Sequence, residues 1–215
     1  MVTTKICPPS GRGRGRPRGF DRDQALDIAL KVFWRLGYEG ASISDLTQAI
    51  GISPTSLYAA FGSKAELYQE TLRRYLSVEG AFSSALTSPE GSTRDAVARV
   101  LHECACRFSN PAHPPGCMIS TAVLACAEEN GAVAGHLAEL RQRAAAVFAA
   151  RIEAGTASGE LATGIDGQAV ARFYSSVIQG MSVQATDGAD AADLHLIADM
   201  AMDAWPNVLA RACRD

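Results

Sequence analysis

The stretch SISDLTQAIGISPTSLYAAFGSKAELY (residues 42–68) carries the start and stop signals of successive short helices. Ser42 is suited to cap a first helix, and Gly51 is suited to end it because glycine tolerates positive φ. Ser53 followed by Pro54 begins a second helix, since a proline in the first turn loses no hydrogen bond. The pattern predicts two short helices separated by a tight glycine turn.

A third helix follows at once. Gly62 ends the second helix, and Ser63 with Glu66 three residues later forms a capping box for the next one. Two short helices joined by a three- to four-residue turn containing Gly form the helix-turn-helix pattern, whose second helix enters the major groove of DNA. The stretch therefore predicts a DNA-reading unit, supported by a preceding helix that begins after Asp21.

Many spaced positions of this region resemble one family. Without a gap, about residues 21–75 resemble the N-terminal domain of the TetR family of transcriptional regulators. The resemblance implies an all-α fold of about nine helices, with a helix-turn-helix domain and a larger ligand-binding and dimerisation domain. The positions that carry it are Phe33, Gly37, Tyr38, Ser42, Leu46, Gly51, Ile52, Ser53, Leu57, Tyr58, Phe61, Ser63, Lys64 and Leu67.

Length and charge agree with two unequal domains. The chain has 215 residues, 47% hydrophobic and 20% charged, which is typical of a globular protein. Residues 1–75 hold eleven Lys or Arg against seven Asp or Glu, a net of +4, whereas residues 76–215 hold nine against sixteen, a net of −7. We expect a basic arm over residues 1–20, a DNA-binding domain over 21–68 and an effector domain over 69–215, with the basic part facing the polyanion.

The sequence has no run of about 20 apolar residues, which a membrane-spanning helix requires. It also lacks the apolar core of a secretory signal, so we expect no membrane partner and a cytoplasmic location. The six cysteines are then expected to be reduced thiols rather than a disulfide framework.

The arm contains GRGRGRPRG (residues 11–19), with arginines at Arg12, Arg14, Arg16 and Arg18. This run resembles the AT-hook pattern, in which an extended Arg-Gly-Arg-Pro core lies in a narrow minor groove. A solubilising basic tail is the alternative. Its place directly before a helix-turn-helix favours the minor-groove arm, as in homeodomains.

In the reading helix, Leu57 and Phe61 are expected to face inward, which leaves mainly hydroxyl groups for DNA. The family resemblance implies that the Tyr58 hydroxyl contacts a phosphate, and partly buried packing is the alternative. No Arg, Asn or Gln lies in this helix, so specificity is expected to depend on DNA shape and the arm. Besides the four arginines, the expected DNA-binding residues are Ser42, Ser44, Ser53, Thr55, Ser56, Tyr58 and Lys64.

The second half reads as further helices. One is expected to run from Ser63 to about Leu86, long enough to belong to both domains, and others over about residues 92–108, 133–158, 166–186 and 190–211. The expected effector pocket is apolar, which suits an uncharged or aromatic compound. Its expected lining residues are Cys104, Phe108, Cys117, Cys126, Phe148 and Phe173.

The last two helices carry apolar residues over wide faces. In the resembling family the equivalent pair forms a four-helix bundle between two subunits, so we expect a homodimer here, with core packing within one subunit as the alternative. The expected interface residues are Phe173, Val177, Met181, Ile197, Met200 and Trp205.

Two chemical options concern cysteine. Cys117 is expected to begin a helix, whose dipole favours a thiolate, so a redox or electrophile sensor with Cys106 as partner is one hypothesis and a small buried residue is the other. His102 and Cys106 share a helix face, but a metal site requires further ligands such as His113 or Cys117. We therefore expect no metal and no cofactor.

These patterns predict a DNA-binding transcriptional regulator, a homodimeric repressor released from a palindromic operator by a small-molecule or redox signal. Nothing in the sequence indicates an enzyme, since it has neither a Ser-His-Asp set nor a phosphate-binding glycine loop. The rival hypothesis is an architectural AT-hook protein without a sensed ligand.

Overall fold

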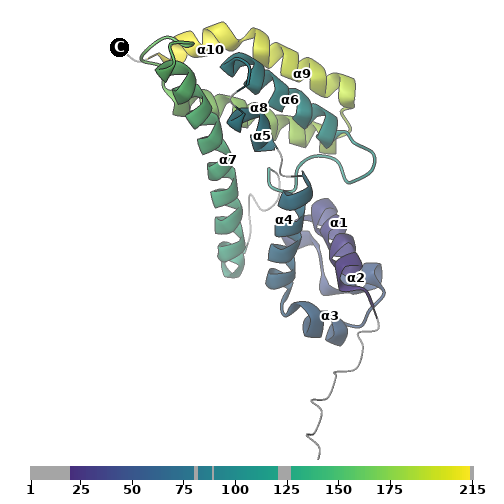
Figure 1. Ribbon diagram of the computed structural model, residues 1–215. Coiled ribbons are helices and arrows are strands. Elements are labelled where there is room, and N and C mark those ends of the chain that lie inside the picture. Colours follow the sequence, from purple (N-terminus) through teal and green to yellow (C-terminus); the bar gives the residue numbers. More distant parts are fainter. Residues whose placement is uncertain (1–19, 80–81, 89, 121–126, 214–215) are drawn as a thin grey trace, which may run out of the picture.

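The computed structural model describes residues 20–79, 82–88, 90–120 and 127–213, and within these ranges the protein is all-helical. The described residues form ten α-helices and one short 3-10 helix, against the expected nine or so, and no strand. Figure 1 shows α1 to α4 at one end of the molecule and α6, α8, α9 and α10 gathered at the other. The expected all-α class is confirmed.

The first four helices follow the predicted caps closely. Ser42 and Asp45 form a complete capping box, with Asp45 N–H donating to Ser42 Oγ at 3.0 Å. Ser53 caps the reading helix, and Gly51 lies between the two helices with φ +79°. The bounds are α1 (Arg22–Gly40), α2 (Ile43–Ile50), α3 (Pro54–Phe61) and α4 (Lys64–Glu79).

The core of this head is aromatic. Phe33 is fully buried and meets Tyr68 edge to face, with ring centroids 4.9 Å apart. Tyr38 packs on the same Tyr68 ring at 5.1 Å. Trp34, the neighbour of Phe33, points instead toward the second half of the molecule, as its place on another helix face predicts.

Two expected helices differ from their predicted bounds among the described residues. Where one helix was expected from Ser63 to about Leu86, the structure describes α4 up to Glu79 and then α5 (Phe82–Thr87), and residues 80–81 lie outside the description. Cys117 does not begin a helix among the described residues: 118–120 form a turn, and 121–126 lie outside the description.

The second half packs around α6 (Thr93–Phe108). The expected last helix over 190–211 is two helices, because Pro206 lies in the first turn of the second and lacks the N–H that a continuous helix needs. Figure 1 shows α7 running from this body toward α4. The remaining elements are η1 (Glu128–Asn130), α7 (Gly131–Ala157), α8 (Gly167–Thr186), α9 (Ala191–Asp203) and α10 (Trp205–Ala212).

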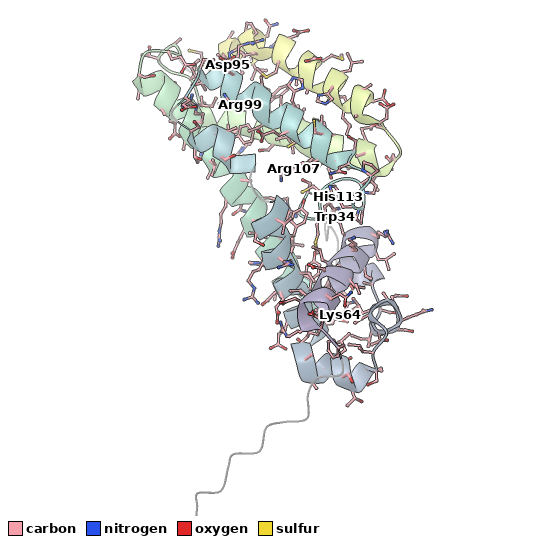
Figure 2. All side chains as sticks on the ribbon, turned by 45° about the vertical axis from the view of Figure 1, so that its right-hand side comes forward. Trp34, Lys64, Asp95, Arg99, Arg107 and His113 are labelled. Atoms are coloured by element: carbon pink, nitrogen blue, oxygen red, sulfur yellow. The ribbon has the colours of Figure 1, made fainter. Side chains whose placement is uncertain are left out.

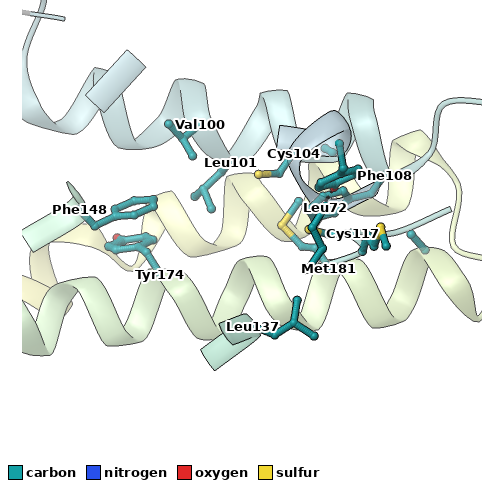
Figure 3. Packing of buried hydrophobic residues seen from close by; sticks show 14 of the residues in the cluster. Leu72, Val100, Leu101, Cys104, Phe108, Cys117, Leu137, Phe148, Tyr174 and Met181 are labelled. Carbon is teal, nitrogen blue, oxygen red and sulfur yellow. Dashed lines mark hydrogen bonds between the residues drawn. The ribbon is translucent and has the colours of Figure 1, made fainter. Parts of the chain in front are cut away.

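The body core lies between α6, α7 and α8. Leu101, Leu137 and Tyr174 are each fully buried there, and Figure 3 shows their side chains among those of the core. Tyr174 also donates a hydrogen bond to the Ala201 carbonyl at 3.2 Å, which ties α8 to α9. This packing fixes the walls of the cavity described below.

Candidate DNA-binding surface and effector pocket

The reading helix α3 presents one polar face. Leu57 and Phe61 are buried, as predicted, whereas Tyr58 is 47% exposed. Thr55 is exposed beside it, and within the described part of the chain neither hydroxyl has a hydrogen-bond partner. The Tyr58 side chain is thus about half exposed, which leaves its hydroxyl accessible to a phosphate.

The serine hydroxyls divide into two groups. Ser42 and Ser53 act as helix caps, and Ser56 Oγ lies 3.0 Å from Ser53 Oγ, so these hydroxyls are already engaged within the head. Ser44 is exposed on α2, and its hydroxyl has no hydrogen-bond partner among the described residues. Ser44, Thr55 and Tyr58 thus have the hydroxyls best placed for phosphate contacts.

Lys64 begins α4 directly after the reading helix. Its ammonium lies 4.4 Å from the centre of the Tyr38 ring, a cation–π geometry. Partial burial lowers the Lys64 pKa, and the nearby Glu39 carboxylate acts in the opposite direction. Lys64 is therefore held against the head, and Figure 2 shows its place there. The arginines Arg12, Arg14, Arg16 and Arg18 lie outside the described residues, so their role stays a prediction.

Aromatic rings join the head to the body. The Trp34 ring of α1 stacks on His113, from the loop after α6, with centroids 4.5 Å apart and planes 19° apart (Figure 2). Tyr75 of α4 meets the edge of the same Trp34 ring at 4.8 Å. Any shift of Tyr75 must therefore move or loosen a side chain of the DNA-binding head.

A second contact joins the end of α1 to the approach of α7. The Glu39 carboxylate accepts hydrogen bonds from Asn130 Nδ2 at 2.9 Å and from the Ala127 backbone N–H at 3.0 Å. Both hydrogen bonds lower the pKa of the Glu39 carboxyl group, and the bond from Asn130 has the larger effect.

The body contains a cavity of about 270 Å³ with a predominantly apolar lining. Four of the six expected effector residues line it: Cys104, Phe108, Cys117 and Phe148. The expectation for Phe173 is wrong, because its ring is 39% exposed on the outer face of α8, and Cys126 lies outside the described residues.

The cavity has an apolar interior and polar side chains from α7 and α8. Val100, Leu140 and Ile178 contribute apolar surface, while Arg141 and Gln179 contribute polar side chains. Arg141 donates to the Ile119 carbonyl at 3.0 Å, so its guanidinium is fixed in the wall. The sequence pattern did not identify these polar residues, because nothing local distinguishes them from other surface positions of α7 and α8.

The Cys117 thiol connects the cavity to the junction. The Tyr75 hydroxyl lies 3.2 Å from Cys117 Sγ, within hydrogen-bond reach, and the Cys117 backbone N–H donates to Ser182 Oγ at 2.8 Å. Figure 3 shows Cys117 and Cys104 among the buried side chains of the body. Burial raises the pKa of the Cys104 thiol far above its usual range, so this thiol stays protonated.

The expected partnership of Cys117 with Cys106 is wrong in this conformation. Cys104 shares the cavity with Cys117, whereas Cys106 is exposed beside His195 of α9. His102 and Cys106 do share a helix face, but neither His113 nor Cys117 joins them. Over the ranges that the structure describes, no three His, Cys, Asp or Glu side chains are arranged to hold a metal ion.

Exposed apolar side chains lie on the outer face of α8 and α9. Phe173 and Met200 are 39% and 63% exposed, as an interface requires, and Val177 and Ile197 are partly buried. Met181 and Trp205 are buried within the subunit, so they cannot contact a partner directly in this conformation. Two residues that the sequence pattern missed, Val183 and Leu196, are instead exposed on the same two helices.

Comparison with known proteins matches both halves of this architecture. The family described as "Bacterial regulatory proteins, tetR family" matches residues 25–71. A second family, "Tetracyclin repressor-like, C-terminal domain", matches residues 94–201, which is just over half of the chain. The chain belongs to the TetR family of transcriptional regulators.

Two TetR-family relatives from Escherichia coli (strain K12) resemble the chain over nearly its whole length. The HTH-type transcriptional repressor ComR is 34% identical over 202 residues, 92% of this chain and 95% of ComR. The HTH-type transcriptional repressor BdcR is 30% identical over 209 residues, 97% of this chain and 99% of BdcR. The expectation of a regulator rather than an enzyme is confirmed.

Solved TetR-family structures give the same result. A cysteine mutant of the regulator CifR, complexed with a 26 bp operator duplex, is 42% identical with a TM-score of 0.83, covering 89% of this chain and all of that one. A putative TetR regulator from Rhodococcus sp. RHA1 is 35% identical with a TM-score of 0.56, covering 89% of this chain and 99% of that one.

Among the helices that the structure describes, none has the length and hydropathy of a membrane-spanning segment.

Proposed function

We propose that this TetR-family regulator is a homodimeric repressor of the cytoplasm that leaves a palindromic operator when a small molecule or a redox signal acts on the cavity. The head comprises residues 21–68, and the effector and dimerisation domain residues 69–215. The observation that carries the proposal is the contact path from Cys117 in the cavity wall through Tyr75 to Trp34 of the head.

The DNA half of the proposal rests on the exposed hydroxyls of the head. Ser44, Thr55 and Tyr58 grip phosphates on either side of the major groove while α3 lies within it. Because α3 carries no Arg, Asn or Gln, it makes no bidentate contact to a purine. The arm and the spacing of the two heads therefore supply much of the specificity.

The dimer half rests on the apolar face of α8 and α9. Phe173, Val183, Leu196 and Met200 are each between 39% and 63% exposed. Covering one of them therefore contributes roughly half of the 1.5–3 kcal/mol that full burial of a fully exposed side chain of this size contributes. A two-fold axis through this face covers the same residues on both subunits. It also sets two heads about one DNA turn, ~34 Å, apart.

The switch follows from the junction. An effector that displaces the Tyr75 hydroxyl or changes the Cys117 thiol alters the position of the Tyr75 ring, against which Trp34 packs. His113, in the loop that leads to Cys117, stacks on the same Trp34 ring. Both routes bias the angle of the head, which shifts the population toward a dimer whose heads no longer match the operator.

The cavity indicates the class of effector. An apolar interior with Arg141, Arg143 and Gln179 at its wall suits a compound with an aromatic or aliphatic body and a single polar or anionic end. The Cys117 thiol additionally offers a nucleophile to an electrophilic effector. A Cys117→Ser variant that hydrogen peroxide releases from DNA as fully as the wild type contradicts the redox form of the proposal.

A fluorescent probe of this chemistry tests the cavity. The dye 1-anilinonaphthalene-8-sulfonate combines an aromatic body with an anion, and we expect one molecule to bind each subunit. Val147→Trp places an indole in the cavity wall and should abolish dye binding, whereas Leu36→Trp, an exposed control on α1, should not. Equal dye binding by both variants, with both folded by circular dichroism, excludes this cavity as the effector site.

Footprinting tests the DNA half. The proposal expects protection of a palindrome with half-sites one turn apart. Protection spread over A·T-rich DNA without a fixed site supports instead the architectural AT-hook hypothesis and contradicts the repressor.

A further inference from the structure

Two pairs of residues on neighbouring helices, each with a partly buried histidine and an exposed partner, form a connected polar chain outside the cavity. His102 and Cys106 lie one turn apart on α6, and His195 and Asp199 lie one turn apart on α9. His195 Nε2 lies 3.4 Å from Cys106 Sγ, and His195 Nδ1 lies 2.8 Å from His102 Nδ1. His102 Nε2 in turn lies 3.3 Å from the Asp199 carboxylate.

With both rings neutral, one arrangement of protons satisfies all these contacts. The Asp199 carboxylate favours a proton on His102 Nε2, which leaves His102 Nδ1 as an acceptor. His195 must then carry its proton on Nδ1, and its Nε2 is left to accept the thiol proton of Cys106. The two imidazole rings are stacked at 5.1 Å with planes 25° apart, so each holds the other in position.

This order of groups is that of an activated nucleophile: a thiol, a base in hydrogen-bond reach, and further groups that orient the base. Cys106 is exposed, so a reagent can reach its sulfur from solvent. Because Asp199 is anionic, it also stabilises the positive charge that the imidazole pair acquires when it takes the thiol proton.

We propose that Cys106 is a modification site that adds to soft electrophiles such as α,β-unsaturated carbonyl compounds, with His195 as its general base. The Cys106 proton passes to His195 Nε2, and the thiolate sulfur forms a bond to the β-carbon. The carbon–carbon π bond breaks, its electron pair moves toward the carbonyl as an enolate, and a proton from His195 finally reaches the α-carbon. Atoms and charge balance without any oxidant.

The site has a consequence for assembly. His195 and Asp199 are sequence neighbours of Leu196 and Met200, the exposed apolar residues of α9. An adduct on Cys106 therefore lies at the margin of the apolar face. The chemistry itself depends on neither the cavity nor the dimer, so it stands or fails separately from the proposed function.

Cys213 supplies a matched control in the same chain. It is also exposed, but its thiol faces the Thr163 carbonyl at 3.6 Å, which is no base. The full-length protein is treated with a small excess of N-ethylmaleimide at neutral pH in the presence of EDTA, and peptide mass spectrometry follows each cysteine. A thiol without a nearby base is only a few per cent ionised at neutral pH, whereas His195 can take the proton of Cys106. We therefore expect labelling of Cys106 to be at least about tenfold faster than that of Cys213.

Variants assign the cause. His195→Gln retains a hydrogen-bonding side chain without a base and should reduce Cys106 to the rate of Cys213, and Asp199→Asn should have an intermediate effect. The Cys213 rate, unchanged in both variants, reports that the fold is intact. Equal rates at the two cysteines in the wild type, or undiminished Cys106 labelling in His195→Gln, overturn the proposal. In a parallel labelling with zinc in place of EDTA, tight stoichiometric zinc binding that blocks Cys106 would also overturn the proposal and assign the cluster to a metal.

Discussion

Gly116 offers a quantitative test of how the cavity wall is attached to α8. Its φ is +76°, and a Cβ at this position would lie 2.7 Å from the Ser182 carbonyl oxygen and 2.8 Å from Thr186 Oγ1. Left-handed backbone with a side chain costs about 1–2 kcal/mol, and overpacking against a rigid helix adds about 1–3 kcal/mol. Gly116→Ala should therefore lower the free energy of unfolding by about 2–5 kcal/mol.

Gly159→Ala is the matched control. Gly159 has nearly the same φ, +79°, but nothing lies within 4 Å of a Cβ built on it, so only the backbone term of about 1–2 kcal/mol applies. Urea unfolding followed by circular dichroism measures both losses, at one protein concentration because the stability of the proposed dimer depends on concentration. Equal losses in the two variants would refute the close contact between Gly116 and α8, and with it the rigid attachment of Cys117.

Three further predictions concern the head. Deleting residues 1–18 should reduce the slope of log affinity against log salt by about 0.9 for each arginine that contacts a phosphate. The deletion should also relax base choice more than Thr55→Ala does. An unchanged slope in operator titrations would contradict the proposed binding of the arm to DNA. Ser53→Ala removes a helix cap and should lower the free energy of unfolding by about 1 kcal/mol. Ser44→Ala should weaken operator binding without lowering the free energy of unfolding. Loss of stability in Ser44→Ala and not in Ser53→Ala would contradict these roles. Because folding lowers the pKa of Glu39, the Glu39 carboxylate stabilises the fold above its unfolded pKa of 4.5, and this stability is lost as the pH falls through the lowered value. The urea midpoint of Glu39→Gln should therefore fall less on acidification than that of the wild type. Identical pH profiles of the two midpoints would exclude the contribution.

The residues predicted to read DNA and those predicted to bind an effector differ in how well sequence could place them. The head was placed almost residue by residue, because each cap bonds a partner only two or three positions away. In the body, Phe173 was expected in the cavity and lies outside it, and Met181 and Trp205 were expected at a surface and are buried. The apolar pattern of a helix predicts that one face is buried, but it does not identify the element that buries this face.

The Cys106 cluster illustrates the same limit. The i, i+4 spacings of His102 with Cys106 and of His195 with Asp199 are visible in the sequence, but they are about 90 residues apart. Only the packing of α6 on α9 brings them together, with Cys106 Sγ 3.4 Å from His195 Nε2.

The sequence by itself therefore determined the DNA-reading head, since Ser42, Ser53 and Gly51 act within one turn of where they stand and need no distant neighbour. The tertiary structure alone decided the cavity, the stacking of Trp34 on His113 and the contact of Tyr75 with Cys117. These features depend on which helices pack together, and that is set by burial of the whole core rather than by any local signal.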